Sequence, residues 1–138
     1  MSRVILVGHG KLALEMKNSA EMIFGKMDKF SAIEFKMEEG LESLSKKIHE
    51  EISAFNREDT LILTDLFCGT PYNAGCAICM KEPSINIEVI SGMSLPLVLE
   101  AATLLNNTPI NEISNILIEY ASEMVKSFEN QIVEEEEL

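Results

Sequence analysis

The feature that most constrains this chain is the alternation of short apolar runs with longer segments of helical periodicity. Four runs have the length and composition of strands, at residues 4–7, 30–35, 60–64 and 85–90. Helical segments separate and follow them, at residues 11–24, 40–55, 70 to about 80, 95–105 and 110–128. This order predicts an α/β fold, a three-layer α/β/α sandwich around a mostly parallel sheet with strand order 2-1-3-4.

Each helical segment is expected to bury one apolar face against the sheet. The predicted face of the first segment comprises Leu12, Met16, Ala20, Ile23 and Phe24. That of the second comprises Leu41, Leu44, Ile48, Ile52 and Phe55. No linker or internal repeat divides the chain, so we expect one domain over residues 1–130 and an acidic tail at residues 131–138.

The charge of the chain excludes two classes of partner. A formal net charge of −12 over 138 residues repels nucleic acid phosphates and anionic lipid. It favours basic protein partners instead. No apolar run approaches the roughly 18 residues that span a bilayer. The N-terminus enters a strand without a secretion signal, so we expect a cytoplasmic protein.

The cysteines predict neither a disulfide framework nor a metal site. Cys68, Cys76 and Cys79 are an odd number in a chain without a secretion signal. Cys76 and Cys79 have CxxC spacing, but no second pair or nearby histidine completes four zinc ligands. We interpret both as small apolar side chains on a helix, and expect no metal and no cofactor. His49 lies among charged residues and is expected to be exposed.

Two polar residues follow apolar strands at the edge where open α/β sheets bind ligands. His9 follows the first strand, and Asp65 follows the third. These strands are neighbours in the order 2-1-3-4, so the two side chains are expected to meet. A histidine that only fills a turn is the alternative, but a carboxylate at the matching position favours a functional pair.

A helix N-terminus is predicted beside this pair. Thr70 is expected to cap the third helical segment, and Pro71 suits its first turn. The Thr70 hydroxyl and free N–H groups near Tyr72 and Asn73 would bind an anion. Gly10 leaves little bulk around the imidazole. The candidate phosphoryl-binding residues are therefore Thr70, Tyr72, Asn73 and Gly10.

This arrangement predicts phosphoryl transfer through a histidine. Asp65 would accept a hydrogen bond from the Nδ1–H of His9, which leaves Nε2 as the nucleophile. The ring becomes a cation when Nε2 attacks phosphorus, and the carboxylate would stabilise that cation. The turn at Thr70 would hold the phosphoryl oxygens, since such transfer depends on positioning and electrostatics.

The sequence resembles one family at these same residues, the mannose-family IIA components of the bacterial phosphoenolpyruvate-dependent sugar phosphotransferase system. The motifs are Val7-Gly8-His9-Gly10 and Asp65-Leu66-Phe67-Cys68-Gly69-Thr70-Pro71-Tyr72-Asn73. The second closely resembles the family pattern D-x-x-G-G-[ST]-P-x-N. Residues 90–96 also resemble the family's turn from the fourth strand into a helix, and the resemblance covers nearly the whole chain.

The resemblance implies a phosphoryl carrier in sugar uptake. His9 would be the phosphorylated residue, Asp65 its orienting partner and Thr70 a phosphoryl contact. The implied partners are HPr as donor, a IIB component as acceptor, the membrane sugar-transport components indirectly, and a second copy of the chain in a homodimer. Cys68 stands where a glycine is usual, and the strand that family dimers exchange is not evident in the sequence.

Two other functions remain open from the sequence. A regulatory or dihydroxyacetone-kinase-type module would carry a phosphohistidine without serving sugar transport, although the kinase-type domains lack the Gly-[Ser/Thr]-Pro-x-Asn turn. A His/Asp hydrolase would need Cys68 or Thr70 as its nucleophile. Alkylation of Cys68 separates these ideas, because a hydrolase would lose activity whereas a carrier would still be labelled.

Overall fold

The fold was analysed in a computed structural model, which describes residues 1–129; the predicted acidic tail at 131–138 lies outside them. Four strands form one sheet, and all pair in parallel. In spatial order they are β2 (Phe30–Phe35), β1 (Ser2–His9), β3 (Asp59–Thr64) and β4 (Ile87–Ile90). The predicted α/β class and strand order are confirmed.

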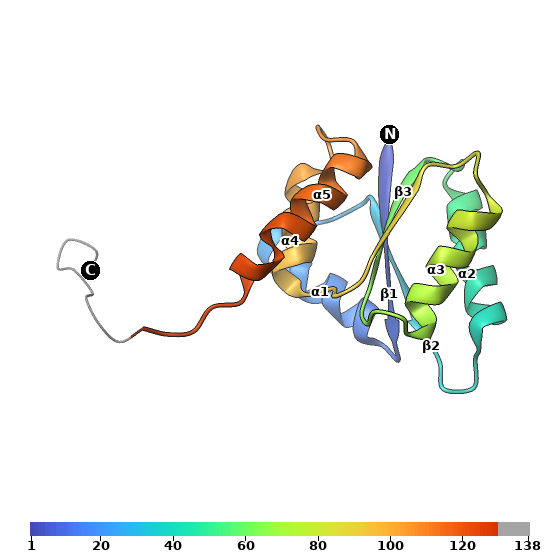
Figure 1. Cartoon of the computed structure of the whole chain (residues 1–138), viewed down its shortest axis with the longest axis horizontal. Coiled ribbons are helices and arrows are strands. Elements are labelled where there is room, and N and C mark those ends of the chain that lie inside the picture. The colour runs from blue at the N-terminus through green and yellow to red at the C-terminus, as the bar shows by residue number, and fades with distance from the viewer. Residues whose placement is uncertain (130–138) are drawn as a thin grey trace.

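Helices cover both faces of the sheet (Figure 1). On one face lie α1 (Leu12–Phe24), α4 (Leu95–Leu104) and α5 (Ile110–Tyr120), and on the other lie α2 (Leu41–Ala54) and α3 (Thr70–Lys81). These are the three layers of the predicted sandwich. None of the helices within residues 1–129 is long and apolar enough to cross a membrane.

The central strand β1 is apolar because both of its faces are covered. Val4 and Leu6 belong to the core beneath α1, α4 and α5, whereas Ile5 and Val7 belong to the core beneath α2 and α3. All four side chains are at most 2% exposed. Because parallel strands end at the same edge, His9 emerges from this buried strand beside the ends of β2 and β3.

The buried face of α1 differs from the predicted one. Of the predicted residues, Ala20 is fully buried and Met16 packs partly buried against the core, whereas Leu12, Ile23 and Phe24 are exposed. Ala13, which was not predicted, is also fully buried, since small side chains at the contact allow a helix to approach its neighbours closely. The prediction for α2 was closer, since three of its five residues, Leu44, Ile48 and Ile52, are buried.

The last helix is shorter than predicted. We expected it to reach Phe128, but α5 ends at Tyr120 and is followed by a short 3-10 helix, Ala121–Met124. Leu117 is its last fully buried residue, and Phe128 is exposed. Helices of this length depend on burial of an apolar face, so α5 ends where it leaves the core. Strand β4 likewise begins two residues later than predicted, at Ile87.

Candidate active site

His9 and Asp65 meet at the carboxyl edge of the sheet, as predicted. Nδ1 of His9 lies 2.8 Å from Oδ2 of Asp65, and the His9 backbone N–H donates to the same oxygen at 2.9 Å. The Asp65 side chain is only 10% exposed. Its other oxygen, Oδ1, is buried and has no hydrogen-bond partner within residues 1–129. The hydrogen bonds of this carboxylate are therefore made to His9 alone.

The imidazole of His9 is open on the other side. Its side chain is 50% exposed, and Nε2 makes no hydrogen bond within the described part of the chain. A neutral imidazole carries its proton on one nitrogen, and the carboxylate at Nδ1 assigns the proton to that nitrogen. Nε2 therefore holds the free lone pair of the ring.

Two further residues enclose this imidazole. Phe35 lies opposite His9 in the β1–β2 register, and the ring centroids are 5.5 Å apart with planes at 74°, an edge-to-face contact. A Cβ at Gly69 would lie 3.4 Å from Cε1 of His9, so the absence of a side chain there leaves room for the ring. Neither role was predicted from the sequence. The predicted strand order brings the end of β2 beside His9, but the register that pairs Phe35 with His9 was not part of the prediction.

Gly10 turns the chain sharply after His9. Its φ of +57° favours glycine, and a Cβ there would meet nothing within 4 Å. The position of a side chain at residue 10, next to His9 in the chain, is therefore open. The Gly10 N–H donates to the Phe35 carbonyl at 2.8 Å, however, so it is not available to a phosphoryl oxygen. Gly10 provides room rather than a hydrogen bond.

The N-terminus of α3 lies beside the imidazole through Gly69. The N-cap residue is Gly69 rather than Thr70, which is instead the first helical residue. Within residues 1–129 the Thr70 hydroxyl and the N–H groups of Thr70 and Tyr72 have no acceptor, as is usual for a first helical turn. Unpaired donors at the positive end of a helix dipole favour an anion.

Asn73 makes two hydrogen bonds within the turn and helix. Its N–H, which the sequence predicted to be free, donates to the Gly69 carbonyl at 2.9 Å. It already makes the first hydrogen bond of the helix. The side-chain amide of Asn73 donates to the Cys68 carbonyl at 3.2 Å and so stabilises the turn before α3. Cys68 has a φ of +64°, a conformation that favours glycine.

Exposed apolar side chains form a rim beside the site. They include Leu12, Leu66 and Phe67, and the Phe67 ring packs against Tyr72 at 5.1 Å between centroids. The pKa of Tyr72 is raised, chiefly by its hydrogen bond to Cys76 and then by repulsion from that thiol's charged form. The phenol therefore stays neutral and does not repel a phosphoryl group.

The other predicted features lie away from this site. His49, expected to be exposed, is half-buried and lies 2.9 Å from Glu82, because the end of α3 packs beside α2. Cys79 donates to the Ile87 carbonyl, and burial raises the pKa of its thiol. Throughout residues 1–129, no group of three or more His, Cys, Asp or Glu side chains is arranged to hold a metal ion.

The fold is shared with solved IIA components of phosphotransferase systems. A family model described as the PTS system fructose IIA component matches residues 3–118. The chain therefore belongs to the mannose family of IIA components of the sugar phosphotransferase system, which take part in phosphoryl transfer during sugar uptake.

Similar proteins carry related names. The chain is 38% identical to a sorbose-specific EIIA component of Lacticaseibacillus casei, over 94% of this chain and 92% of that protein. It is 32% identical to a fructose-specific EIIA component of Bacillus subtilis strain 168, over 85% and 80% of the two chains. A solved mannose/sorbose-specific IIA subunit from Enterococcus faecalis superposes with a TM-score of 0.86 at 25% identity, covering 96% of this chain and 98% of that one.

Proposed function

We propose that this chain is a phosphoryl carrier that accepts a phosphoryl group from phospho-HPr on Nε2 of His9 and passes it to a IIB component. The observation that carries the proposal is the His9–Asp65 pair. Oδ2 of Asp65 binds Nδ1 at 2.8 Å, while Nε2 is left unpaired on a half-exposed ring. A nucleophile with a fixed tautomer and an open approach is what acceptance from another protein requires.

The transfer balances without a cofactor. The lone pair of Nε2 forms a P–N bond as the P–N bond of the donor phosphohistidine breaks, and the donor imidazole keeps the released electron pair. The Nδ1 proton stays on His9, where Asp65 offsets the positive charge of the phosphorylated ring. The Thr70 hydroxyl and the N–H groups of Thr70 and Tyr72 would bind the phosphoryl oxygens.

The surface around the site suits a protein donor. Exposed Leu12, Leu66 and Phe67 offer apolar contact area beside His9. The net charge of −12 accelerates encounters with basic partners. These features support HPr and a IIB component, and through them the membrane sugar-transport components, as partners.

We also include a homodimer in the proposal. β4 is an edge strand, so its outer side carries backbone groups that no strand within residues 1–129 pairs with. An edge of this kind can accept a strand from a second copy. Sedimentation analysis of the whole chain tests this, and a monomer at all concentrations would contradict it.

Phosphoryl labelling tests the carrier function. Phosphoenolpyruvate, enzyme I and HPr are supplied to wild type, His9→Ala and His49→Ala, and acid-labile label is counted. We expect label on wild type and His49→Ala and none on His9→Ala. His49→Ala is the matched control, because it removes the other histidine–carboxylate contact. A wild type that takes no label from an active donor would exclude the proposed function.

Two further experiments test transfer to a IIB component and the hydrolase alternative. Adding a IIB component to the labelled protein should move the label, whereas a regulatory module would retain it. Alkylating Cys68, which is exposed, should leave labelling intact. Loss of all activity on alkylation would favour a cysteine hydrolase instead.

A further inference from the structure

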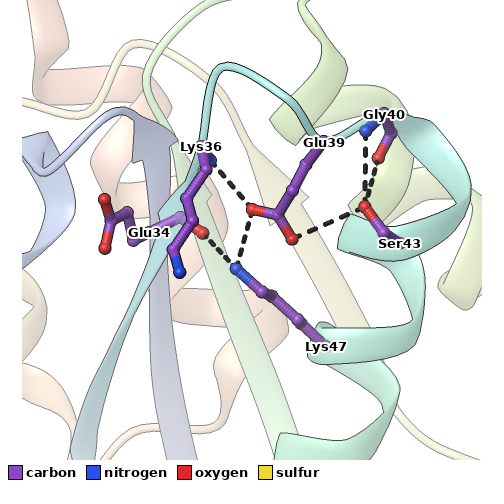
Figure 2. A network of polar contacts seen from close by, with 6 residues as sticks. All are labelled: Glu34, Lys36, Glu39, Gly40, Ser43 and Lys47. Atoms are coloured by element: carbon purple, nitrogen blue, oxygen red, sulfur yellow. Dashed lines mark hydrogen bonds and ion pairs between the residues drawn. The ribbon is translucent and has the colours of Figure 1, made fainter.

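The backbone on both sides of Phe35 is held by one pair of side chains from outside the site. Nζ of Lys47, on α2, donates to the Glu34 carbonyl at 2.9 Å. Oε1 of Glu39 accepts a hydrogen bond from the Lys36 N–H at 2.8 Å. The same oxygen accepts from Nζ of Lys47 at 2.8 Å, so Lys47 and Glu39 form an ion pair (Figure 2). Residues 34 and 36 are thus fixed by the ion pair that we call the Lys47–Glu39 clamp.

The clamp is itself well supported. The hydroxyl of Ser43 lies 3.5 Å from Oε2 of Glu39, and it accepts from the Gly40 N–H at 3.3 Å (Figure 2). The Glu39 side chain is 14% exposed, which limits screening by water. The hydrogen bond from Lys47 lowers the pKa of Glu39, so the carboxylate is ionised at neutral pH. Charge-assisted hydrogen bonds of this kind are stronger than neutral ones.

The clamp holds the backbone around Phe35, whose ring lies against the imidazole of His9. Phe35 exchanges two backbone hydrogen bonds with Gly10, at 2.8 and 3.3 Å, and its ring packs edge-to-face on His9. Within residues 1–129 the side chain of His9 makes a single hydrogen bond, to Asp65. One hydrogen bond at Nδ1 does not by itself prevent the ring from tilting about that atom. The Phe35 ring lies on the β2 side and opposes such a tilt. The direction of Nε2 depends on both contacts.

We propose that Phe35 is a positioning residue for phosphoryl transfer through His9, and that the Lys47–Glu39 clamp acts through it. The inference rests on the proposed function. In-line transfer requires Nε2 to point at phosphorus, and small misplacements of reacting groups lower rates strongly. The polar groups of the clamp bind each other and the backbone of residues 34 and 36, so its effect on transfer is through the orientation of Phe35.

The chain offers matched controls for this proposal. Lys46→Met removes the same charge as Lys47→Met from the neighbouring position, where the lysine has no partner within residues 1–129. Glu38→Gln likewise matches Glu39→Gln. Each variant is labelled with phospho-HPr over a range of donor concentrations, and NMR of ¹⁵N-histidine reports the tautomer and ring mobility of His9.

We expect Lys47→Met and Phe35→Leu to lower kcat about tenfold with an unchanged KM for the donor. Glu39→Gln, which keeps a neutral acceptor, should lose less. The NMR spectra should show the Nδ1–H tautomer retained and the ring of His9 more mobile, whereas Lys46→Met and Glu38→Gln should match wild type. Circular dichroism confirms folding; if Phe35→Leu does not fold, the Lys47 and Glu39 variants decide.

Three results would overturn the inference while leaving the carrier function intact. The first is wild-type kcat in Lys47→Met, the second an equal loss in Lys46→Met, and the third a raised KM at constant kcat, which would mean a docking role. Absence of label on wild type would instead overturn the proposed function and this inference with it.

Discussion

Two histidines of this chain are hydrogen-bonded to a carboxylate at almost the same distance, yet we propose only one of them, His9, as the phosphoryl carrier. Nδ1 of His9 lies 2.8 Å from Asp65, and Nε2 of His49 lies 2.9 Å from Glu82. The two imidazoles are also similarly exposed, at 50% and 43%. Distance and exposure therefore do not distinguish the two pairs.

The nitrogen that is bound, and the remaining contacts of the carboxylate, do distinguish them. Asp65 holds Nδ1 and leaves the outer nitrogen free, whereas Glu82 occupies that outer nitrogen in His49. Within the described residues, Asp65 is hydrogen-bonded to His9 alone. Glu82 also lies 3.6 Å from the guanidinium of Arg57. The second pair is thus part of a surface ion-pair cluster.

The two histidine–carboxylate pairs lie at opposite ends of helix α3. Its N-terminus lies at His9, through Gly69, and Glu82 is the residue that caps its C-terminus. The positive end of the helix dipole favours a phosphoryl group, and the negative end opposes one. A histidine–carboxylate contact therefore indicates a phosphoryl site only together with a free ring nitrogen and a nearby helix N-terminus.

The largest expected effect comes from neutralising Asp65, with Glu82 as the control. Asp65→Asn should slow labelling by roughly 10²–10⁴-fold, because the amide no longer fixes the tautomer or offsets the cation. Glu82→Gln should leave the labelling rate unchanged. Rapid-quench labelling with phospho-HPr measures both rates. Equal losses in the two variants would remove the distinction between the pairs.

A smaller effect should follow from adding one methyl group at a helix start. Gly69 and Gly40 are the N-cap residues of α3 and α2, and both have backbone angles that alanine accepts. The new Cβ in Gly69→Ala would lie 3.4 Å from Cε1 of His9, whereas in Gly40→Ala it meets nothing within 4 Å. We expect labelling to slow about tenfold in Gly69→Ala only. An unaffected Gly69→Ala would show that the ring has room to move.

The sheet order and the meeting of His9 and Asp65 could be predicted from sequence, because both depend on the order of strands and helices along the chain. The alternation of strands and helices predicted the sheet order, and the sheet order brought His9 and Asp65 to one edge. The burial of α1 could not be predicted in this way. Its alanines and its larger apolar residues have similar helical spacing, and only packing decides which side faces the sheet.

The missed features of the site depend on single-residue detail. A shift of one residue in the start of α3 decides which N–H groups are free, and so the Asn73 N–H is paired where the sequence predicted it to be free. The contact of Phe35 with His9 depends on the exact register of β1 and β2. Periodicity locates elements but not their ends or registers.

Each pair also has a non-glycine residue with a left-handed backbone nearby, Cys68 in one case and Arg57 in the other. Cys68→Gly should relieve roughly 1–2 kcal/mol of strain. The greater freedom of glycine in the unfolded chain offsets about 0.4–1 kcal/mol of this. We expect a net gain in unfolding free energy of about 0.5–1 kcal/mol, measured by denaturant unfolding, with labelling unchanged.

Arg57→Gly provides the control for that gain. It removes the same kind of strain, but it also removes the contacts of the guanidinium with Glu82 and Ser84, at 3.6 and 3.2 Å. Its stability should therefore rise less than that of Cys68→Gly. A Cys68→Gly protein no more stable than wild type would mean that the thiol contributes contacts that balance its strain.

The smallest effect concerns acid stability, and it should belong to the second pair. The hydrogen bond from His49, followed by the charge of Arg57, lowers the pKa of Glu82 from its ordinary value of 4.5. A lowered pKa in the folded state stabilises the protein above 4.5, and this contribution is lost as the pH falls through the lowered pKa. Wild type should therefore exceed Glu82→Gln in stability at neutral pH, and the difference should shrink in acid.

Glu50→Gln, an exposed change on α2, is the control, and denaturant unfolding over a pH series measures all three. A constant difference would show that the His49–Glu82 contact does not depend on charge, and the contrast with Asp65 would then rest on position alone.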